Sequence, residues 1–182
     1  MVRIFFAYIK RNSSVKQYMN STVSVCFVCL GNICRSPLAQ GVFEALVKNE
    51  GLQDRIIISS AGVGNWHVGN LPDSRMQKTA QKHGINLNSR AQQFQAADFK
   101  KMDLVLAMDR SNLNALLQMG PESELKDKLF LFRTFDPENN NNLEVPDPYY
   151  GGDNGFEMVY QIVERACPKV LEYLKRELTN KT

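Results

Sequence analysis

The sequence predicts an α/β fold with a single domain, a doubly wound four-stranded parallel sheet with helices on both faces. Short apolar runs alternate with helical patterns along the chain, which is typical of parallel strands joined by helices. With 182 residues, 43% of them hydrophobic, the chain can bury one core of good size. Ligands of such folds bind beyond the carboxyl ends of the strands, so functional residues are expected there.

The first half of the chain contains two predicted strands, each followed by a helix. The apolar run from Val23 to Val28 predicts the first strand, and apolar residues at helical spacing predict a helix up to about Asn49. The run Ile56–Ile58 is typical of a buried strand. A helix is expected from about Ser74 to His83, because Asp73 can cap its start.

The second half repeats this order. Asp103 to Ala107 predicts a third strand, and Ser111 to Leu117 predicts the helix after it. Leu129 to Phe132 is expected to form a short fourth strand. A last helix is expected from about Gly155 to Leu178, and Pro168 should either kink this helix or be accommodated in it.

The loop between the first strand and the first helix carries the most informative motif, C-L-G-N-I-C-R-S-P at residues 29–37. Ser36 is a good N-cap and Pro37 a good first helical residue, so the loop is expected to close on a helix N-terminus, where a dianion binds readily. Arg35 can grip two phosphate oxygens at once. In this field Cys29 is expected to be a thiolate at neutral pH and a nucleophile, and the Ser36 hydroxyl can donate to it.

Two further residues suit such a loop. Gly31 lets the backbone curl close to a ligand, and Asn32 tolerates a left-handed conformation. The alternative is that Cys29 is an ordinary buried cysteine whose spacing from Arg35 is coincidental.

Charge and cysteine content argue against several classes of protein. Four of the 22 basic residues and none of the 19 acidic ones lie within residues 1–20, so the remaining chain is near neutral and no nucleic-acid partner is indicated. The four cysteines do not form a disulfide framework, and the histidines are wrongly spaced for a metal site with Cys26 and Cys29. We therefore expect reduced thiols, a cytoplasmic location, no metal and no cofactor.

A second motif supplies an acid. The segment V-P-D-P-Y-Y-G-G-D at residues 145–153 places Asp147 between two prolines that stiffen the loop, which suits a general acid. Tyr149 and Tyr150 can form an aromatic wall beside it, as an aryl phosphate would require. Prolines and acids also occur in ordinary solvent loops.

From about Val23 to Leu178 the chain resembles the low-molecular-weight protein tyrosine phosphatases, on the strength of the two motifs and their order. The resemblance implies Cys29 as nucleophile, Arg35 as phosphate and transition-state clamp, and Asp147 as general acid and then activator of water. It implies phosphate binding by Leu30, Gly31, Asn32, Ile33, Cys34, Arg35 and Ser36. It implies loop support by Asn32, Ser36 and Ser60, and aromatic walls at Trp66 and Tyr149.

The same resemblance bears on redox chemistry, partners and domain limits. Cys34 is similar to the family's second cysteine, which can form a reversible disulfide with Cys29. The segment from Met108 to Leu113 is similar to one whose acid lies near the loop. The implied partners are phosphotyrosine proteins, with no membrane, and the protein is expected to be a monomer or weak dimer. The phosphatase domain is expected over 22–180, after a basic leader at 1–21 that is disordered or, with Met19 as native start, not native.

One departure and three alternatives remain open. Many family members have a histidine where Ser89 or Arg90 stands, so the network around Asn32 is expected to be thinner or rebuilt. Arsenate reductases of this fold need further cysteines, and none lies between residues 35 and 166. Protein arginine phosphatases tend to have threonine at Ile33. A non-catalytic phosphate-binding module would lack Cys29 or Asp147.

Overall fold

The computed structural model describes residues 21–150 and 152–181. The predicted leader, apart from Ser21, lies outside the described residues. The four predicted strands are confirmed: β1 (Val23–Cys29), β2 (Ile56–Gly62), β3 (Leu104–Ala107) and β4 (Leu129–Leu131). All neighbouring strands are parallel, in the order β2-β1-β3-β4, so the predicted parallel sheet is correct.

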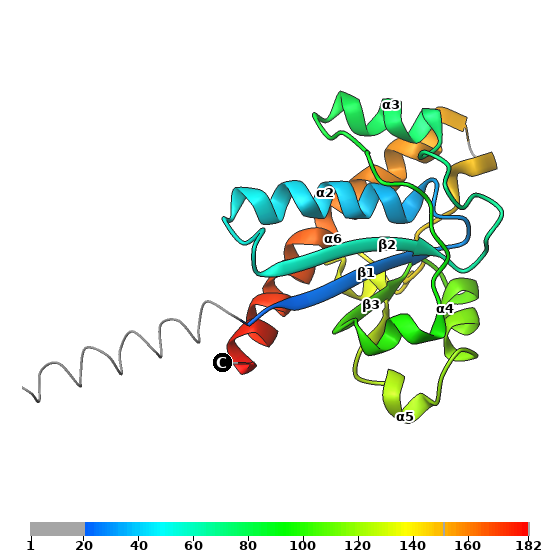
Figure 1. The fold of residues 1–182 in the computed structure, drawn as a ribbon. Coiled ribbons are helices and arrows are strands. Elements are labelled where there is room, and N and C mark those ends of the chain that lie inside the picture. Colours follow the sequence, from blue (N-terminus) through cyan, green and yellow to red (C-terminus); the bar gives the residue numbers. More distant parts are fainter. Residues whose placement is uncertain (1–20, 151, 182) are drawn as a thin grey trace, which may run out of the picture.

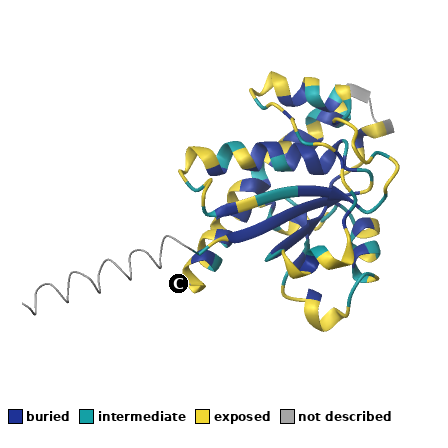
Figure 2. Ribbon diagram, viewed as in Figure 1, coloured by how far each residue is buried: buried dark blue, intermediate teal, exposed yellow. Residues whose placement is uncertain are grey.

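Helices cover both faces of the sheet, as predicted for a doubly wound fold (Figure 1). The helices are α2 (Arg35–Asn49), α3 (Ser74–Lys82), α4 (Arg110–Leu117), α5 (Glu122–Leu125) and α6 (Gly152–Asn180). On one face, Val25 and Phe27 of β1 belong to a core cluster shared with α2 and α6. On the other, Cys26 and Val28 belong to a cluster shared with α4 and α5. Strand β1 is buried along its whole length (Figure 2).

Register brings the carboxyl ends of three strands together. Cys29 at the end of β1 pairs with Gly62 at the end of β2, and Val28 pairs with Ala107 at the end of β3. Every segment that follows these strand ends therefore starts from the same edge of the sheet. Three short 3₁₀ segments that the sequence did not predict lie in the connections, at Ala96–Lys100, Phe132–Phe135 and Pro148–Tyr150.

The start of α2 differs from the prediction. The helix begins at Arg35 with Cys34 at the N-cap, so Ser36 and Pro37 lie inside the first turn. Ser36 is therefore not the N-cap; its single hydroxyl proton is directed at Cys29 Sγ at 3.0 Å, with the Ala61 carbonyl as a second acceptor at 3.2 Å. At the other end of the chain, α6 continues past Pro168, which is accommodated.

None of the helices in the described part of the chain is both long and apolar enough to cross a membrane.

Candidate active site

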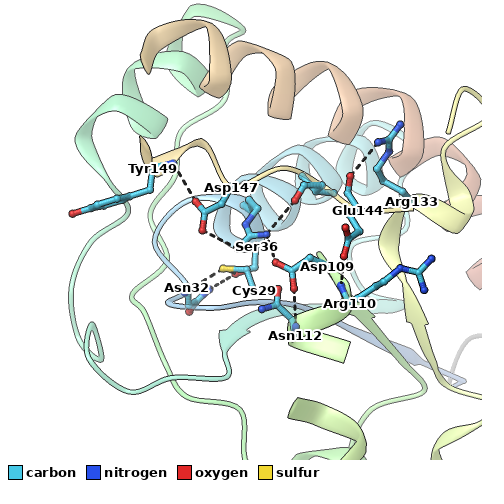
Figure 3. A network of polar contacts seen from close by, with 12 residues as sticks. Cys29, Asn32, Ser36, Asp109, Arg110, Asn112, Arg133, Glu144, Asp147 and Tyr149 are labelled. Atoms are coloured by element: carbon cyan, nitrogen blue, oxygen red, sulfur yellow. Dashed lines mark hydrogen bonds and ion pairs between the residues drawn. The ribbon is translucent and has the colours of Figure 1, made fainter. Parts of the chain in front are cut away.

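The loop after β1 wraps around the sulfur of Cys29. Asn32 has a φ of 55°, the left-handed conformation expected for it, and its backbone N–H points at Cys29 Sγ at 3.2 Å. The Ser36 hydroxyl donates to the same sulfur at 3.0 Å. Figure 3 shows both contacts converging on Cys29. Two donors, one from the backbone and one from a side chain, are therefore directed at one sulfur.

The end of β2 supports this loop from outside. The N–H groups of Val63 and Gly64 donate to the carbonyls of Cys29 and Leu30, both at 2.9 Å. A Cβ on Gly62 would lie 2.9 Å from the Leu30 carbonyl oxygen, so only glycine allows the two backbones to approach this closely.

The Asn32 side chain is the centre of the support network. Its Nδ2 donates to the hydroxyls of Ser36 and Ser60, both at 2.9 Å. Its Oδ1 accepts from the backbone N–H of Gln92 at 2.9 Å. All three members of the expected support set (Asn32, Ser36 and Ser60) are thus in direct contact, and each is at most 2% exposed.

Two glutamines extend this network, and neither was predicted as a site residue. The Ser60 hydroxyl donates to Gln40 Oε1 at 2.6 Å, and Gln92 Nε2 donates to the Ser60 carbonyl at 2.9 Å. Ser89, one of the two residues expected at the position of the family histidine, lines a separate cavity beside Gln40. The network around Asn32 and Ser60 thus includes both Gln40 and Gln92.

Arg35 is held on three sides. Its guanidinium donates to Asp109 Oδ2 at 2.5 Å, to the Val145 carbonyl at 3.1 Å and to Asp147 Oδ2 at 3.1 Å. The side chain is 3% exposed. Burial alone would lower the pKa of Arg35, but electrostatic interaction with Cys29 and hydrogen bonding to Asp109 raise it. Arg35 is therefore a cation of fixed orientation at the floor of the site.

Asp109 owes its position to the end of β3. It is the N-cap of α4, where its Oδ1 accepts from the Asn112 N–H at 2.7 Å while its Oδ2 faces Arg35. A single carboxylate thus both starts a helix and orients the guanidinium.

Asp147 faces the same space from the other side. One of its oxygens pairs with Arg35, and the other accepts from the Tyr149 N–H at 3.1 Å. Its side chain is 41% exposed, so water can reach the carboxylate.

A cavity of about 240 Å³ lies between these groups. It is lined by Cys29, Leu30, Gly31, Ile33, Cys34, Arg35, Trp66, His67, Asp147 and Tyr149. The structure therefore brings both expected motifs and the expected wall residues Trp66 and Tyr149 together. His67, the neighbour of Trp66 in the chain, also lines the cavity. Tyr150 ends the segment Pro148–Tyr150, and the position of its side chain lies outside what the structure describes.

The second loop cysteine has a different environment from the first. Cys34 also lines the cavity, but burial and the nearby Asp73 raise the pKa of its thiol to about 12. All four cysteines are free and buried. Over residues 21–150 and 152–181, no three His, Cys, Asp or Glu side chains are grouped so that they could hold a metal ion.

A loop that closes on a helix N-terminus around a cysteine and an arginine, in a cavity that a carboxyl also lines, is typical of the class of cysteine-dependent phosphatases. The family model "Low molecular weight phosphotyrosine protein phosphatase" matches residues 24–180. The chain belongs to this family.

Curated relatives and solved structures agree with this assignment. A low molecular weight protein-tyrosine-phosphatase of Streptomyces coelicolor is 42% identical over 86% of this chain and 96% of its own. A low molecular weight phosphotyrosine protein phosphatase of Sus scrofa is 43% identical over 85% and 97%. The crystal structure of a protein tyrosine phosphatase from Entamoeba histolytica, with Hepes in its active site, has a TM-score of 0.81 and 38% identity, covering 86% and 99%. A Drosophila arginine phosphatase has a TM-score of 0.75 and 34% identity, covering 83% and 97%.

Proposed function

We propose that this protein hydrolyses phosphotyrosine in proteins, and other aryl phosphate monoesters, through a phosphate ester of Cys29. The observation that carries the proposal is the single cavity lined by Cys29, Arg35 and Asp147. A nucleophile, a cation and an acid around one anion-sized space can act on the same phosphorus atom.

Binding comes first. The phosphoryl group sits against the loop at residues 30–36, whose backbone lies at the N-terminus of α2. Arg35 grips two of its oxygens with the planar guanidinium, which Asp109 already holds in orientation. The substrate ring lies between Trp66 and Tyr149, whose side chains are 69% and 42% exposed at the rim.

Two displacements at phosphorus follow. In the first, Cys29 Sγ forms a bond to phosphorus while the bond to the tyrosine oxygen breaks, and protonated Asp147 gives its proton to the departing phenoxide. In the second, the Asp147 carboxylate takes a proton from water, the water oxygen attacks phosphorus, and the sulfur–phosphorus bond breaks. Inorganic phosphate and the Cys29 thiolate are regenerated, so no oxidant or reductant is consumed. Arg35 stabilises the charge on the transferring oxygens in both steps.

The preference for an aryl substrate rests on the cavity lining. Ile33 faces the cavity with a branched apolar side chain, which suits a flat ring better than a guanidinium. We therefore place phosphoarginine behind phosphotyrosine as a substrate, although the fold also occurs in the Drosophila arginine phosphatase.

The cellular compartment and the oligomeric state of the protein are proposed from two separate observations. Four free, buried cysteines suit a reducing compartment such as the cytoplasm. The site is built from one chain, so a monomer or weak dimer suffices.

The test is p-nitrophenyl phosphate hydrolysis in EDTA and reductant, with Cys29→Ser beside the wild type. Turnover that the substitution abolishes is expected, and Cys26→Ala serves as a control because Cys26 is on the opposite face of the sheet core. No turnover by the wild type, with phosphate or vanadate still bound, would mean a phosphate-binding module. Faster turnover of phosphoarginine than of phosphotyrosine peptides would mean an arginine phosphatase.

A further inference from the structure

Arg75 is in the first turn of α3 and is not part of the cavity lining, yet it contacts the segments that form both halves of the cavity. Its neighbour Asp73 donates its backbone N–H to the carbonyl of Ile33 in the phosphate-binding loop at 2.7 Å. Arg75 is locked to Asp73 through two side-chain bonds, from Nε at 3.0 Å and from NH2 at 2.8 Å. The guanidinium is thereby fixed relative to the phosphate-binding loop.

The remaining nitrogen of Arg75 reaches the acid loop. NH1 donates to the Tyr149 carbonyl at 3.1 Å. The guanidinium carbon also lies 5.0 Å from the centre of the Tyr149 ring and 4.8 Å from that of Phe156, at the start of α6. One side chain therefore contacts both the backbone and the ring of the residue that forms one wall of the cavity.

Tyr149 in turn contacts the acid. Its N–H donates to Asp147 Oδ1 at 3.1 Å, and Asp147 Oδ2 pairs with Arg35 at 3.1 Å (Figure 3). A closed ring of contacts thus runs from the phosphate-binding loop through Asp73, Arg75, Tyr149 and Asp147 back to that loop. Within this ring, Asp73 and Arg75 are the members that do not line the cavity.

We propose that Arg75 is a positioning residue that sets the place of Asp147 relative to the bound phosphoryl group. The proposal rests on the proposed function, because it assigns Arg75 a task only if Asp147 is the acid. When substrate occupies Arg35, the pairing of Asp147 with that guanidinium competes with the phosphate oxygens. The N–H of Tyr149, whose carbonyl accepts a hydrogen bond from Arg75, then becomes the main contact that keeps the carboxyl at the leaving oxygen.

Arginine is suited to this role and lysine is not. The planar group uses one edge for the Asp73 carboxylate, a further nitrogen for the Tyr149 carbonyl and its faces for two rings. An ammonium at the same place provides one point charge and cannot do all three. The hydrogen bonds from Arg75 lower the pKa of Asp73, so the pair stays ionised.

The experiment uses the leaving-group dependence of kcat/KM, because an acid matters most for poor leaving groups. Phenyl phosphate and p-nitrophenyl phosphate are compared in the wild type, Arg75→Ala, Arg75→Lys and Asp147→Ala. We expect Arg75→Ala to lower kcat/KM about tenfold for phenyl phosphate and less than about threefold for p-nitrophenyl phosphate, as a partial loss of the ~10²–10⁴-fold contributed by a placed acid. Arg75→Lys should lose nearly as much selectivity as alanine.

The double variant and a matched surface change separate positioning from a general structural effect. In the Asp147→Ala background, Arg75→Ala should cause no further selective loss on phenyl phosphate. Lys78→Ala, which removes an exposed cation from the same helix, should leave both substrates unchanged. Arg75→Gln extends the test if the alanine variant folds poorly, and thermal unfolding is measured for each variant.

Three results would overturn the proposal. Equal losses of kcat/KM on both substrates in Arg75→Ala would mean that Arg75 has a general structural role. Wild-type kinetics in Arg75→Ala would mean that Arg75 is dispensable. A selective loss that persists in the Asp147→Ala background would mean that Arg75 acts on the leaving group independently of Asp147. If Asp147→Ala itself shows no leaving-group selectivity, the acid assignment in the proposed function fails first. A selective Asp147→Ala beside an unselective Arg75→Ala refutes only the role of Arg75.

Discussion

Replacing Asn32 by alanine removes the residue that supports the phosphate-binding loop in two ways. Its side chain makes three hydrogen bonds, to Ser36, to Ser60 and from the N–H of Gln92, and its backbone has a φ of 55°. The side chain is buried, so water cannot replace these bonds without entering the core.

The magnitude follows from these two terms. Each hydrogen bond contributes about 1 kcal/mol net. A left-handed backbone costs an alanine roughly 1–2 kcal/mol, whereas glycine adopts it without this strain. We therefore expect Asn32→Ala to lower the free energy of unfolding by about 4 kcal/mol, and Asn32→Gly by about 3 kcal/mol, out of the ~5–15 kcal/mol typical of a domain.

Urea unfolding of both variants is the assay, with p-nitrophenyl phosphate kinetics on the same samples. Asn141 has a φ of 65° on an exposed loop, so Asn141→Ala provides a control that incurs the backbone term alone, about 1 kcal/mol. The kcat/KM of Asn32→Ala should fall roughly 10²-fold, because the hydrogen-bond donors of the loop are no longer held in the orientation that binds the phosphoryl group. If Asn32→Ala is at least as stable as Asn32→Gly, the assumed cost of a left-handed alanine is refuted. If both variants lose less than about 1 kcal/mol of unfolding free energy, the assumed contribution of the three hydrogen bonds is refuted.

Three further outcomes follow from individual contacts. Asp109→Asn should lower kcat/KM at least about tenfold, because Arg35 loses a charged partner; steady-state kinetics checks this, and unchanged kcat/KM would contradict it. Iodoacetate at mildly alkaline pH should leave Cys34 unmodified in peptide maps, because burial raises its thiol pKa to about 12. Burial alone would raise the pKa of Asp136, but the hydrogen bonds from Arg165 lower it, so its stabilisation is present above the unfolded pKa of ~3.9 and is lost as pH falls through the folded value. Asp136→Asn should therefore lower the free energy of unfolding by roughly 3 kcal/mol at neutral pH, and should make it fall less steeply as the pH is lowered. Urea unfolding across the acid pH range checks this, and the same pH dependence in the variant and the wild type would contradict it.

The sequence predicted the framework because framework signals are local. Apolar runs such as Ile56–Ile58 and helical spacing after Pro37 depend on residues next to one another in the chain, and the strand order places their ends side by side. The motif residues Cys29 and Arg35 were found for the same reason, since one loop holds both.

The contacts that Gln40 and Gln92 add to the support network could not be predicted, because they join residues far apart in sequence. Gln40 and Gln92 carry no chemical signature of their own, and their role depends on where Ser60 comes to lie. The start of α2 was misplaced because Ser36 followed by Pro37 has the local pattern of a cap. That hydroxyl instead donates to Cys29 Sγ in the preceding loop, and the helix begins at Arg35, two residues before the predicted first residue Pro37.

Transfer of the phosphoryl group to Cys29 can be tested directly by mass spectrometry of an acid-quenched reaction. The wild type is mixed with p-nitrophenyl phosphate, quenched in the steady state and digested, and fragmentation locates any added phosphoryl group. We expect one phosphoryl group on Cys29, absent from Cys29→Ser and retained in Cys26→Ala. A phosphoryl group on another side chain, or undiminished turnover by Cys29→Ser, would contradict it.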